Sequence, residues 1–238
     1  MTASTTKWGR KAADLYQPAY ARRYRNHDDE LPSGEVYAEF SIWLRRACEM
    51  FAKPIDVLDL GCGTGRYFNV LTNTRTIVGI DASPAMLDEA RRPLNAERVT
   101  AGVELIEGDF LTYDFGPERF DLVYSVGVLA EHSPLDEHVV SRVARWLKPA
   151  GRFAFTTVHP DSASIPATWG RSIGRAVVPL VPPPARSWLR RRLLADGLYA
   201  DERRVRDLLE PTFAIESLTR MQSEAHLHTL CVARKNRG

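Results

Sequence analysis

The sequence predicts one α/β domain, in which a mostly parallel sheet carries helices on both faces. Apolar runs rich in β-type residues alternate with helical patterns between residues 55 and 158. The first run ends in a glycine-rich turn, Asp59 to Gly65, which is typical of a junction where a strand and helix bind a nucleotide. At 238 residues the chain is long enough for one large core.

Two helices are expected before the first strand. Asp14 to Arg25 places apolar and aromatic residues at helical spacing, although Pro18 limits its regularity. Glu35 to Phe51 reads as an amphipathic helix that exposes one polar face.

The central region predicts alternating elements joined by right-handed crossovers. The expected elements are a strand at 55–60, a helix at 64–72, a strand at 76–81, a helix at 84–92, strands at 103–107 and 120–125, a helix at 136–147 and a strand at 151–158. Ser83 and Pro84 form a good helix start, with a hydroxyl cap followed by proline at the first helical position. A helix from Ala200 to Leu209 and two strands, Phe213 to Thr219 and His226 to Ala233, close the chain.

Three carboxylates follow consecutive strands. Asp59 ends the first run, and Asp81 ends the second about twenty residues later, where a carboxylate can accept both ribose hydroxyls of a nucleoside. Asp109 and Phe110 follow the third run, and together they suit the amino edge and the face of an adenine. The sequence therefore predicts an adenosine-type ligand at the carboxyl ends of the strands.

With these motifs the chain resembles the class I S-adenosylmethionine-dependent methyltransferases of the small-molecule type. The resemblance rests on VLDLGCGTGR, GIDASPAML, EGDF, FDLVYS and WLKPAGRFAFT, in that order. It implies a Rossmann-like seven-stranded sheet with an antiparallel C-terminal hairpin strand, an insert after the fifth strand, and S-adenosylmethionine as cofactor. It also implies methyl transfer to a small molecule.

The resemblance assigns a set of cofactor-binding residues. Asp59 orients the glycine turn and reaches the amino group of the donor, Asp81 binds the ribose, and an N-terminal aromatic residue lies near the sulfonium. The expected set is Tyr16, Tyr24, Asp59, Gly61, Cys62, Gly63, Gly65, Asp81, Ala82, Met86, Asp109, Phe110, Ser125 and Val126. The alternative for the tyrosines is a stripe that packs the helix onto the domain.

Histidines are the candidate catalytic bases. His132, which follows the fourth strand beside Glu131, is the first candidate, and His159 after the fifth strand is the second. His138 reads as a surface residue. His226 and His228 share one face of the last strand and could contribute to a metal site, but no third ligand is in view, so we expect a structural role and no metal.

We expect four parts in the single domain: N-terminal cap helices at 1–52, a donor-binding core at 53–158, a lid at 159–199 and a closing helix with a hairpin at 200–238. The insert 159–199 is rich in proline and arginine and leaves the carboxyl edge of the sheet. We interpret it as a substrate cap whose arginines favour an anionic or lipid-linked acceptor. The alternative is a basic surface insertion.

The composition of the chain argues against several classes of protein. The net charge of +2 gives no global field for nucleic acid, and the three cysteines have no metal or disulfide spacing, as expected for a reducing cytoplasm. No apolar run is long enough to span a bilayer, and the polar N-terminus lacks a secretory segment. The sequence gives no indication of the oligomeric state.

The acceptor atom stays open. A histidine base favours O-methylation of a sugar, a lipid-linked intermediate or a natural product, and N- or C-methylation of a small metabolite is the alternative. A non-catalytic adenosyl-binding protein is a further alternative. A nicotinamide-dependent oxidoreductase is disfavoured because Arg66 occupies the position of the third glycine.

Overall fold

The computed structural model describes residues 5–30, 35–162, 180–182, 198–223 and 226–237. The helices are α1 (Lys7–Leu15), α2 (Pro18–Glu30), α3 (Glu35–Glu49), α4 (Pro84–Ala90), α5 (Glu137–Trp146) and α8 (Glu202–Leu209), with short 3-10 turns η2 (Phe68–Val70) and η3 (Ala96–Arg98). The strands are β1 (Ile55–Leu60), β2 (Thr74–Asp81), β3 (Gly102–Glu107), β4 (Phe120–Ser125), β5 (Leu147–Val158), β6 (Phe213–Gln222) and β7 (Leu227–Lys235).

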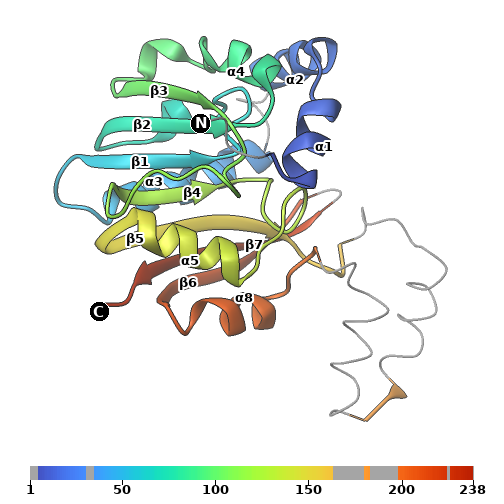
Figure 1. The fold of residues 1–238 in the computed structure, drawn as a ribbon, viewed down its shortest axis with the longest axis vertical. Coiled ribbons are helices and arrows are strands. Elements are labelled where there is room, and N and C mark those ends of the chain that lie inside the picture. Colours follow the sequence, from blue (N-terminus) through green and yellow to red (C-terminus); the bar gives the residue numbers. More distant parts are fainter. Residues whose placement is uncertain (1–4, 31–34, 163–179, 183–197, 224–225, 238) are drawn as a thin grey trace.

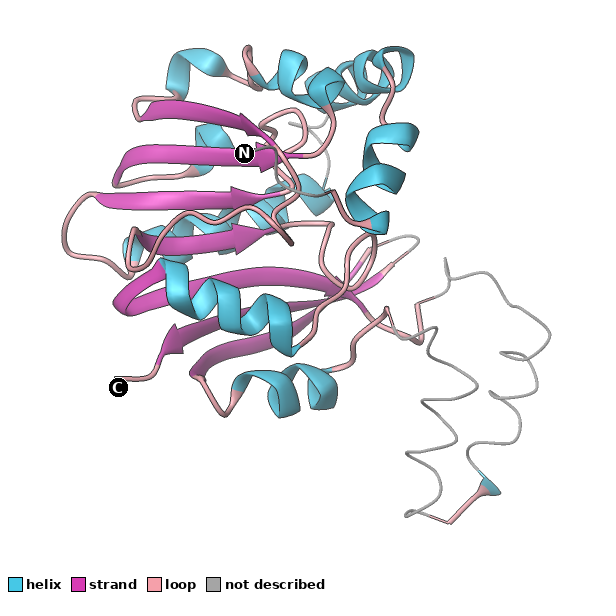
Figure 2. Cartoon of the chain, in the orientation of Figure 1, coloured by secondary structure: helices cyan, strands magenta, loops and turns pink. Residues whose placement is uncertain are grey.

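The strands form one seven-stranded sheet in the order β3-β2-β1-β4-β5-β7-β6. β1 to β5 are parallel, so their carboxyl ends meet at one edge of the sheet, on the right in Figures 1 and 2. β7 runs antiparallel to both β5 and β6. The predicted fold class is confirmed, with the detail that the antiparallel strand lies one place inside the edge and β6 forms the edge.

Each face of the sheet has its own core, because successive side chains of a strand point to opposite faces. Leu58 and Leu60 of β1 pack on the face covered by α5 and α8. Ile55 and Val57 of the same strand pack on the other face, with the buried side of α3. This two-sided burial explains why the strands read as nearly continuous apolar runs.

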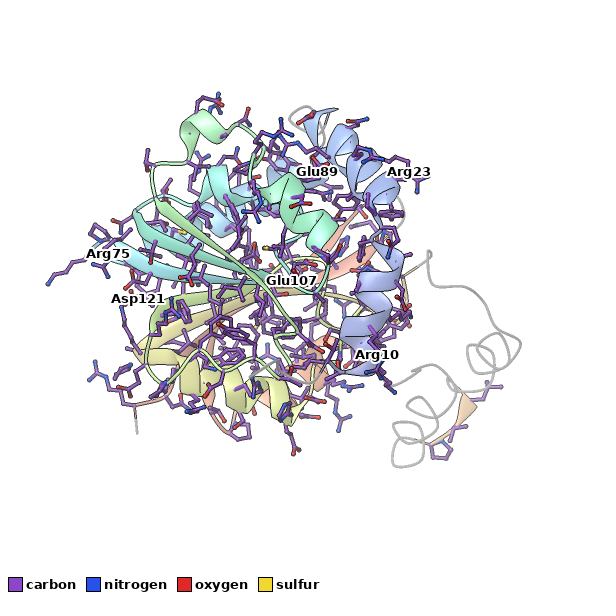
Figure 3. The ribbon with its side chains drawn as sticks, turned by 45° about the horizontal axis from the view of Figure 1, so that its top comes forward. Arg10, Arg23, Arg75, Glu89, Glu107 and Asp121 are labelled. Carbon is purple, nitrogen blue, oxygen red and sulfur yellow. The ribbon has the colours of Figure 1, made fainter. Side chains whose placement is uncertain are left out.

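The first two helices lie beside the carboxyl ends of the parallel strands (Figure 1). Figure 3 shows Arg10 of α1 and Arg23 of α2 at this end of the molecule, with Arg75 and Asp121 at the opposite end. α1 and α2 therefore cover the edge where the sequence predicts a ligand.

The helix predicted at 64–72 is wrong. The structure has a series of turns there, followed by the single 3-10 turn η2. Gly61, Gly63 and Gly65 all have positive φ, at 74°, 54° and 71°. A backbone that returns repeatedly to the left-handed region cannot propagate a right-handed helix.

The helix predicted at Asp14 to Arg25 is two helices. α1 ends at Leu15 and α2 begins at Pro18, because proline fits a first helical position but disfavours helical geometry in the residue before it. α3 agrees with the helix predicted at Glu35 to Phe51, within two residues.

Most of the predicted lid at 159–199 lies outside the described residues, so the four-part division of the chain stays a prediction.

β5 begins at Leu147, four residues before the expected start of that strand, and β6 and β7 each extend beyond the predicted ranges. None of the helices in the described ranges combines the length and the apolar composition that a bilayer span requires.

Candidate active site

A cavity of about 980 Å³ opens at the carboxyl ends of β1 to β4, beneath α1 and α2. Its size is at the upper end of the range that ligand sites usually span, about 300–1,000 Å³. Thirteen of the predicted residues line it: Tyr16, Tyr24, Asp59, Gly61, Cys62, Gly63, Asp81, Ala82, Met86, Asp109, Phe110, Val126 and His132. The structure thus brings together residues that are up to 116 positions apart, from Tyr16 to His132.

The glycine turn forms the floor of the cavity. Gly61 and Cys62 donate their backbone N–H groups to the Ile80 carbonyl, at 2.9 and 3.1 Å, which holds the turn against the end of β2. A Cβ on Gly61 would lie 2.7 Å from a methyl group of Val128. The turn therefore needs glycine at position 61 both for its backbone angle and for space.

Asp81 stands at the end of β2 and organises the surrounding backbone. Its Oδ2 accepts a hydrogen bond from the Gly63 N–H and its Oδ1 accepts one from the Ser83 N–H, both at 2.9 Å. Burial raises the pKa of this carboxyl, against the opposing effect of these backbone donors. Each oxygen keeps a lone pair for a ligand hydroxyl.

Asp59 is the most deeply buried of the three carboxyls that follow strands. Its Oδ2 accepts a hydrogen bond of 2.6 Å from the hydroxyl of Tyr124, its direct neighbour across the β1–β4 pair. Burial raises the pKa of Asp59 to about 8, so the protonated form predominates at neutral pH. Asp59 can then both donate and accept a hydrogen bond.

Asp109 is joined to the N-terminal segment. Its Oδ2 accepts hydrogen bonds from the backbone N–H of Thr6 at 2.8 Å and from the Thr6 hydroxyl at 2.5 Å, while its Oδ1 accepts one from the Leu111 N–H at 2.9 Å. The same Thr6 hydroxyl caps α1 by accepting from the Gly9 N–H. Asp109 therefore anchors the start of α1 over the cavity, a contact that the sequence did not indicate.

Three tyrosines form an aromatic wall. Tyr16 lies at the end of α1, and its ring makes edge contacts with Tyr20 and Tyr24 of α2, at centroid distances of 5.3 and 6.5 Å. Tyr20 and Tyr24 stack on each other. All three tyrosines line the cavity, and their rings also pack the two helices together, as the alternative for this stripe expects. Their contact with a cofactor stays a prediction.

An ion pair that the sequence did not reveal connects α2 with the glycine turn. Asp28 is fully buried and accepts hydrogen bonds from the Thr64 hydroxyl and, at 2.6 Å, from the Arg66 Nε. The Arg66 guanidinium also lies 4.5 Å from the ring centroid of Tyr24 and lines the cavity. Arg66 thus places a positive charge beside the glycine turn, at a position where a nicotinamide fold would have glycine.

Glu131 and His132 lie on the turn after β4, and both line the cavity. Their side chains approach to 3.6 Å between Glu131 Oε1 and His132 Nε2, and the His132 ring contacts Tyr16 edge-on. Burial raises the pKa of Glu131 to about 7 and lowers the pKa of His132, the nearby Lys11 lowering it further. His132 is therefore neutral at physiological pH, as a base must be.

The structure does not bring His159 to the cavity. Its ring is buried after the end of β5, where Nδ1 accepts a hydrogen bond from the Asp161 N–H and Nε2 lies 3.6 Å from Glu202. Gly65 and Ser125 also stay outside the lining. Gly65 packs against Phe68, and the Ser125 hydroxyl donates to the Leu60 carbonyl at 2.9 Å.

Cys62 lines the cavity, although almost all of its surface is buried. Burial, together with Asp81 and Asp59, raises the pKa of its thiol well above the ordinary value. The thiol is therefore protonated at neutral pH, and its neighbours disfavour a nucleophilic role.

The structure adds His226 and His228 to the cavity lining. Their alternation on one strand was visible in the sequence, but their distance from the other site residues along the chain concealed the connection. No group of three or more potential metal ligands occurs within the described ranges.

Comparisons with known proteins identify the same core. The family described as "Methyltransferase domain" matches residues 57–151. The chain is 35% identical over 100 residues to a sterol 24-C-methyltransferase of Clavispora lusitaniae, covering 41% of this chain and 26% of that protein. It is 30% identical over 104 residues to a ubiquinone biosynthesis O-methyltransferase of Coxiella burnetii, covering 43% of each. The chain therefore spans about a quarter to less than half of these curated relatives.

A solved structure agrees over a longer range. The N-methyltransferase NodS of Bradyrhizobium japonicum, determined in complex with S-adenosyl-L-homocysteine, superposes with a TM-score of 0.62 at 15% identity and covers 91% of this chain and 99% of its own. At 15% sequence identity, this similarity is evidence for the fold alone. The names of the three proteins give three acceptor atoms: carbon for the sterol methyltransferase, oxygen for the ubiquinone enzyme and nitrogen for NodS. The shared core is therefore compatible with different acceptor atoms.

Proposed function

We propose that this chain, a class I S-adenosylmethionine-dependent methyltransferase by its domain and its fold, transfers a methyl group from that cofactor to a small-molecule acceptor. The observation that carries the proposal is the cavity at the strand ends, in which Asp81, the glycine turn and the tyrosine wall converge. S-adenosylmethionine supplies a methyl group on a positively charged sulfur when it binds.

The residues of the cavity fit this cofactor part by part. Asp81 has free lone pairs for two ribose hydroxyls, and the bare backbone at Gly61 and Gly63 permits close approach of the nucleoside. Arg66 keeps N–H donors beyond those that Asp28 uses and can donate them to a carboxylate, and Asp59 can accept a hydrogen bond from an amino group. Ala82, Met86 and Phe110 supply apolar contacts for the base.

The tyrosine wall suits a positively charged sulfur. Tyr16, Tyr20 and Tyr24 present aromatic rings to the cavity, and a ring face attracts a cation by about 0.5–2 kcal/mol. Glu131 lies on the same side of the cavity and adds a negative field. The tyrosine rings and Glu131 align the methyl donor and stabilise its positively charged sulfur, and they take no part in the chemical step.

His132 is the base that removes a proton from the acceptor. It is neutral, it lines the cavity, and Glu131 lies close enough to orient its ring. His159, the second candidate, is not part of the described lining of the cavity, so His132 is the base that we propose. A histidine base supports O-methylation of a sugar, a lipid-linked intermediate or a natural product, and N- or C-methylation of a small metabolite is the alternative.

The proposal is tested by two measurements on the full chain. Calorimetry is expected to detect binding of S-adenosylmethionine and S-adenosylhomocysteine, and Asp81→Asn is expected to weaken both about tenfold or more, since a charged hydrogen-bond acceptor is lost. Transfer of a labelled methyl group is then measured over a panel of acceptors. Absence of binding at millimolar cofactor would overturn the proposal, whereas binding without transfer to any acceptor would indicate a non-catalytic adenosyl-binding protein.

A further inference from the structure

The cavity extends past the residues suited to the cofactor into a second region between α3 and the start of β7. We define the acceptor compartment by Tyr37, Phe40, Tyr67, Met221, His226 and His228. Its wall is continuous: Tyr37 stacks on Tyr67 at 5.6 Å, and Phe40 contacts Tyr67 at 6.4 Å and His228 at 5.2 Å. Met221 is paired with His228 across the β6–β7 ladder.

His228 is a buried polar side chain without a partner. Its Nδ1 is fully enclosed and forms no hydrogen bond, and neither ring nitrogen has a partner within the part of the chain that the structure describes. Buried polar groups in folded proteins are almost always paired, and an unpaired one costs about 1–3 kcal/mol. Because Nδ1 has no accessible surface, a ligand in the compartment would pair with Nε2, the other nitrogen of this ring.

The ring is neutral at physiological pH. Burial, and then the neighbouring His226, lower the pKa of His228 to about 4. In a neutral imidazole Nε2 is either a donor or an acceptor, depending on the tautomer, and a hydroxyl group can pair with it in either case.

The cavity offers little that attracts an anion. Its described lining includes five carboxyl groups, those of Glu39, Asp59, Asp81, Asp109 and Glu131, and burial shifts the pKa of Asp59 and Glu131 toward the neutral form. Arg66 is the arginine of that lining, and its charge is already paired with Asp28. An anionic acceptor, which the arginines of the insert favour in the sequence, would therefore find no arginine in the described lining whose charge is unpaired.

We infer that the acceptor compartment takes an uncharged molecule with an aromatic or apolar ring, and that His228 determines specificity by hydrogen bonding to a hydroxyl group of that molecule. The inference rests on the proposed function. The aromatic wall supplies the contacts of the ring, and the unpaired imidazole supplies the direction of the polar group.

Three probes of similar shape separate these features: 1-naphthol, which has the hydroxyl, naphthalene, which lacks it, and 1-naphthoate, which is an anion. Their affinities are measured by fluorescence with the protein saturated by S-adenosylhomocysteine, so that the adenosine region is filled. We expect 1-naphthol to bind about tenfold more tightly than naphthalene, as one hydrogen bond predicts, and 1-naphthoate to bind least well.

The variant His228→Phe keeps an aromatic ring and removes both nitrogens, so its affinities for 1-naphthol and naphthalene should agree within about twofold. Thr229→Val is the matched control, because Thr229 is also buried with an unpaired hydroxyl but lies outside the cavity lining. It should keep the discrimination of the unmodified protein. If the Phe variant does not fold, His228→Leu serves the same purpose.

Equal affinities of 1-naphthol and naphthalene for the unmodified protein would overturn the inference, as would absence of probe binding or unchanged discrimination in His228→Phe. Tighter binding of 1-naphthoate would overturn the part that concerns charge. Calorimetry of S-adenosylhomocysteine on each variant separates these failures from failure of the proposed function, because His228 lies away from Asp81 and the glycine turn and its loss should leave that affinity unchanged.

Discussion

At the residue scale, burial sets the protonation states within the cavity. Asp59 and Glu131 are carboxyl groups whose pKa rises because water is excluded, whereas His132 and His228 are imidazoles whose pKa falls for the same reason. The pKa of each of these groups is thereby shifted toward the neutral form. Asp59, His132 and His228 are neutral hydrogen-bonding groups at neutral pH, whereas Glu131 is partly ionised beside a cofactor that brings its own positive charge.

Replacement of Glu131 by Gln tests this effect. The folded pKa of about 7 lies above the ordinary 4.5, so the stabilising effect of the protonated form is complete below pH 4.5 and is lost as the pH rises through 7. Glu131→Gln should therefore unfold like the original protein at pH 4.5 but be more stable at pH 8, by up to about 3 kcal/mol. Urea denaturation at both pH values measures this difference.

Glu97→Gln is the control, because Glu97 is an exposed side chain on η3. It should change the stability by less than about 0.5 kcal/mol at either pH. An equal stability of Glu131→Gln and the unmodified protein at pH 8 would show that water reaches this carboxyl freely.

His132→Ala should lower the turnover number by about 10²–10⁴-fold, since proton removal from the acceptor is lost. The affinity for S-adenosylhomocysteine should stay within about twofold. In the unmodified enzyme, turnover should fall only as the pH drops below 6.5, because the pKa of His132 is lowered from that value. Steady-state kinetics with a labelled methyl group gives these parameters.

His138→Ala is the matched control, since His138 is exposed on α5 and contacts the Leu111 carbonyl outside the cavity. Equal losses of turnover and of cofactor affinity in His132→Ala would assign His132 a structural role instead.

At the element scale, α1 and α2 owe their position over the cavity to a few polar contacts. Thr6 joins the start of α1 to Asp109, the hydroxyl of Ser83 donates to the carbonyl of Tyr16 at 2.7 Å, and Asp28 joins α2 to Arg66. Each contact connects a helix to the end of a different strand or to the glycine turn. The cover over the cofactor region is therefore an assembled part of the domain.

Removing the charge of Asp28 should loosen this cover. Asp28→Asn leaves the Arg66 guanidinium without its buried partner, and loss of one member of such a pair costs about 3–5 kcal/mol. The free energy of unfolding should fall by this amount, and the amides of α2 should exchange faster with deuterium. The double variant Asp28→Asn/Arg66→Met should recover much of the loss.

Asp29→Asn is a stringent control, because the carboxylate of the adjacent Asp29 is exposed and pairs with Arg25 at 3.2 Å. A loss for Asp28→Asn that is no larger than that of Asp29→Asn would mean that the buried pair contributes nothing to the position of α2.

At the scale of the whole molecule, the two cores of the sheet hold the strand ends in register, and the cavity is lined by segments from α1 to β7. A ligand that fills it contacts elements from both ends of the chain. Binding should therefore oppose global unfolding as well as local opening.

S-adenosylhomocysteine at about 100 times its dissociation constant should stabilise the fold by about 2.7 kcal/mol and raise Tm by about 5–10 °C. Differential scanning fluorimetry measures the shift, and Asp81→Asn should reduce it. NADH is the comparison ligand and should leave Tm unchanged. A shift with NADH and none with S-adenosylhomocysteine would favour the nicotinamide alternative.

The sequence predicted the strands of the core more accurately than it predicted the structure around the site. The strands β1, β2 and β4 were predictable to within two residues, because two-sided burial makes a strand a nearly continuous apolar run. The helix expected after the glycine turn was wrong, because positive φ at three glycines outweighs the helix-forming residues that follow.

The same contrast holds for individual site residues. Asp59, Asp81 and Asp109 were found from local sequence, because each lies at the end of the strand that delivers it to the cavity or directly after it. Arg66, Asp28 and His228 were not recognised as site residues, because their roles depend on partners that lie far away in the chain.

The sequence by itself determined the sheet, its glycine turn and the three strand-end carboxyls, since these depend on periodicity and on residues adjacent in the chain. Only the tertiary structure decided which histidines reach the cavity, how α1 and α2 cover it, and that Asp28 neutralises Arg66. The physical reason is that burial and pairing are properties of contacts between distant segments, and burial determines both the charge of a side chain and the ligand that it can bind.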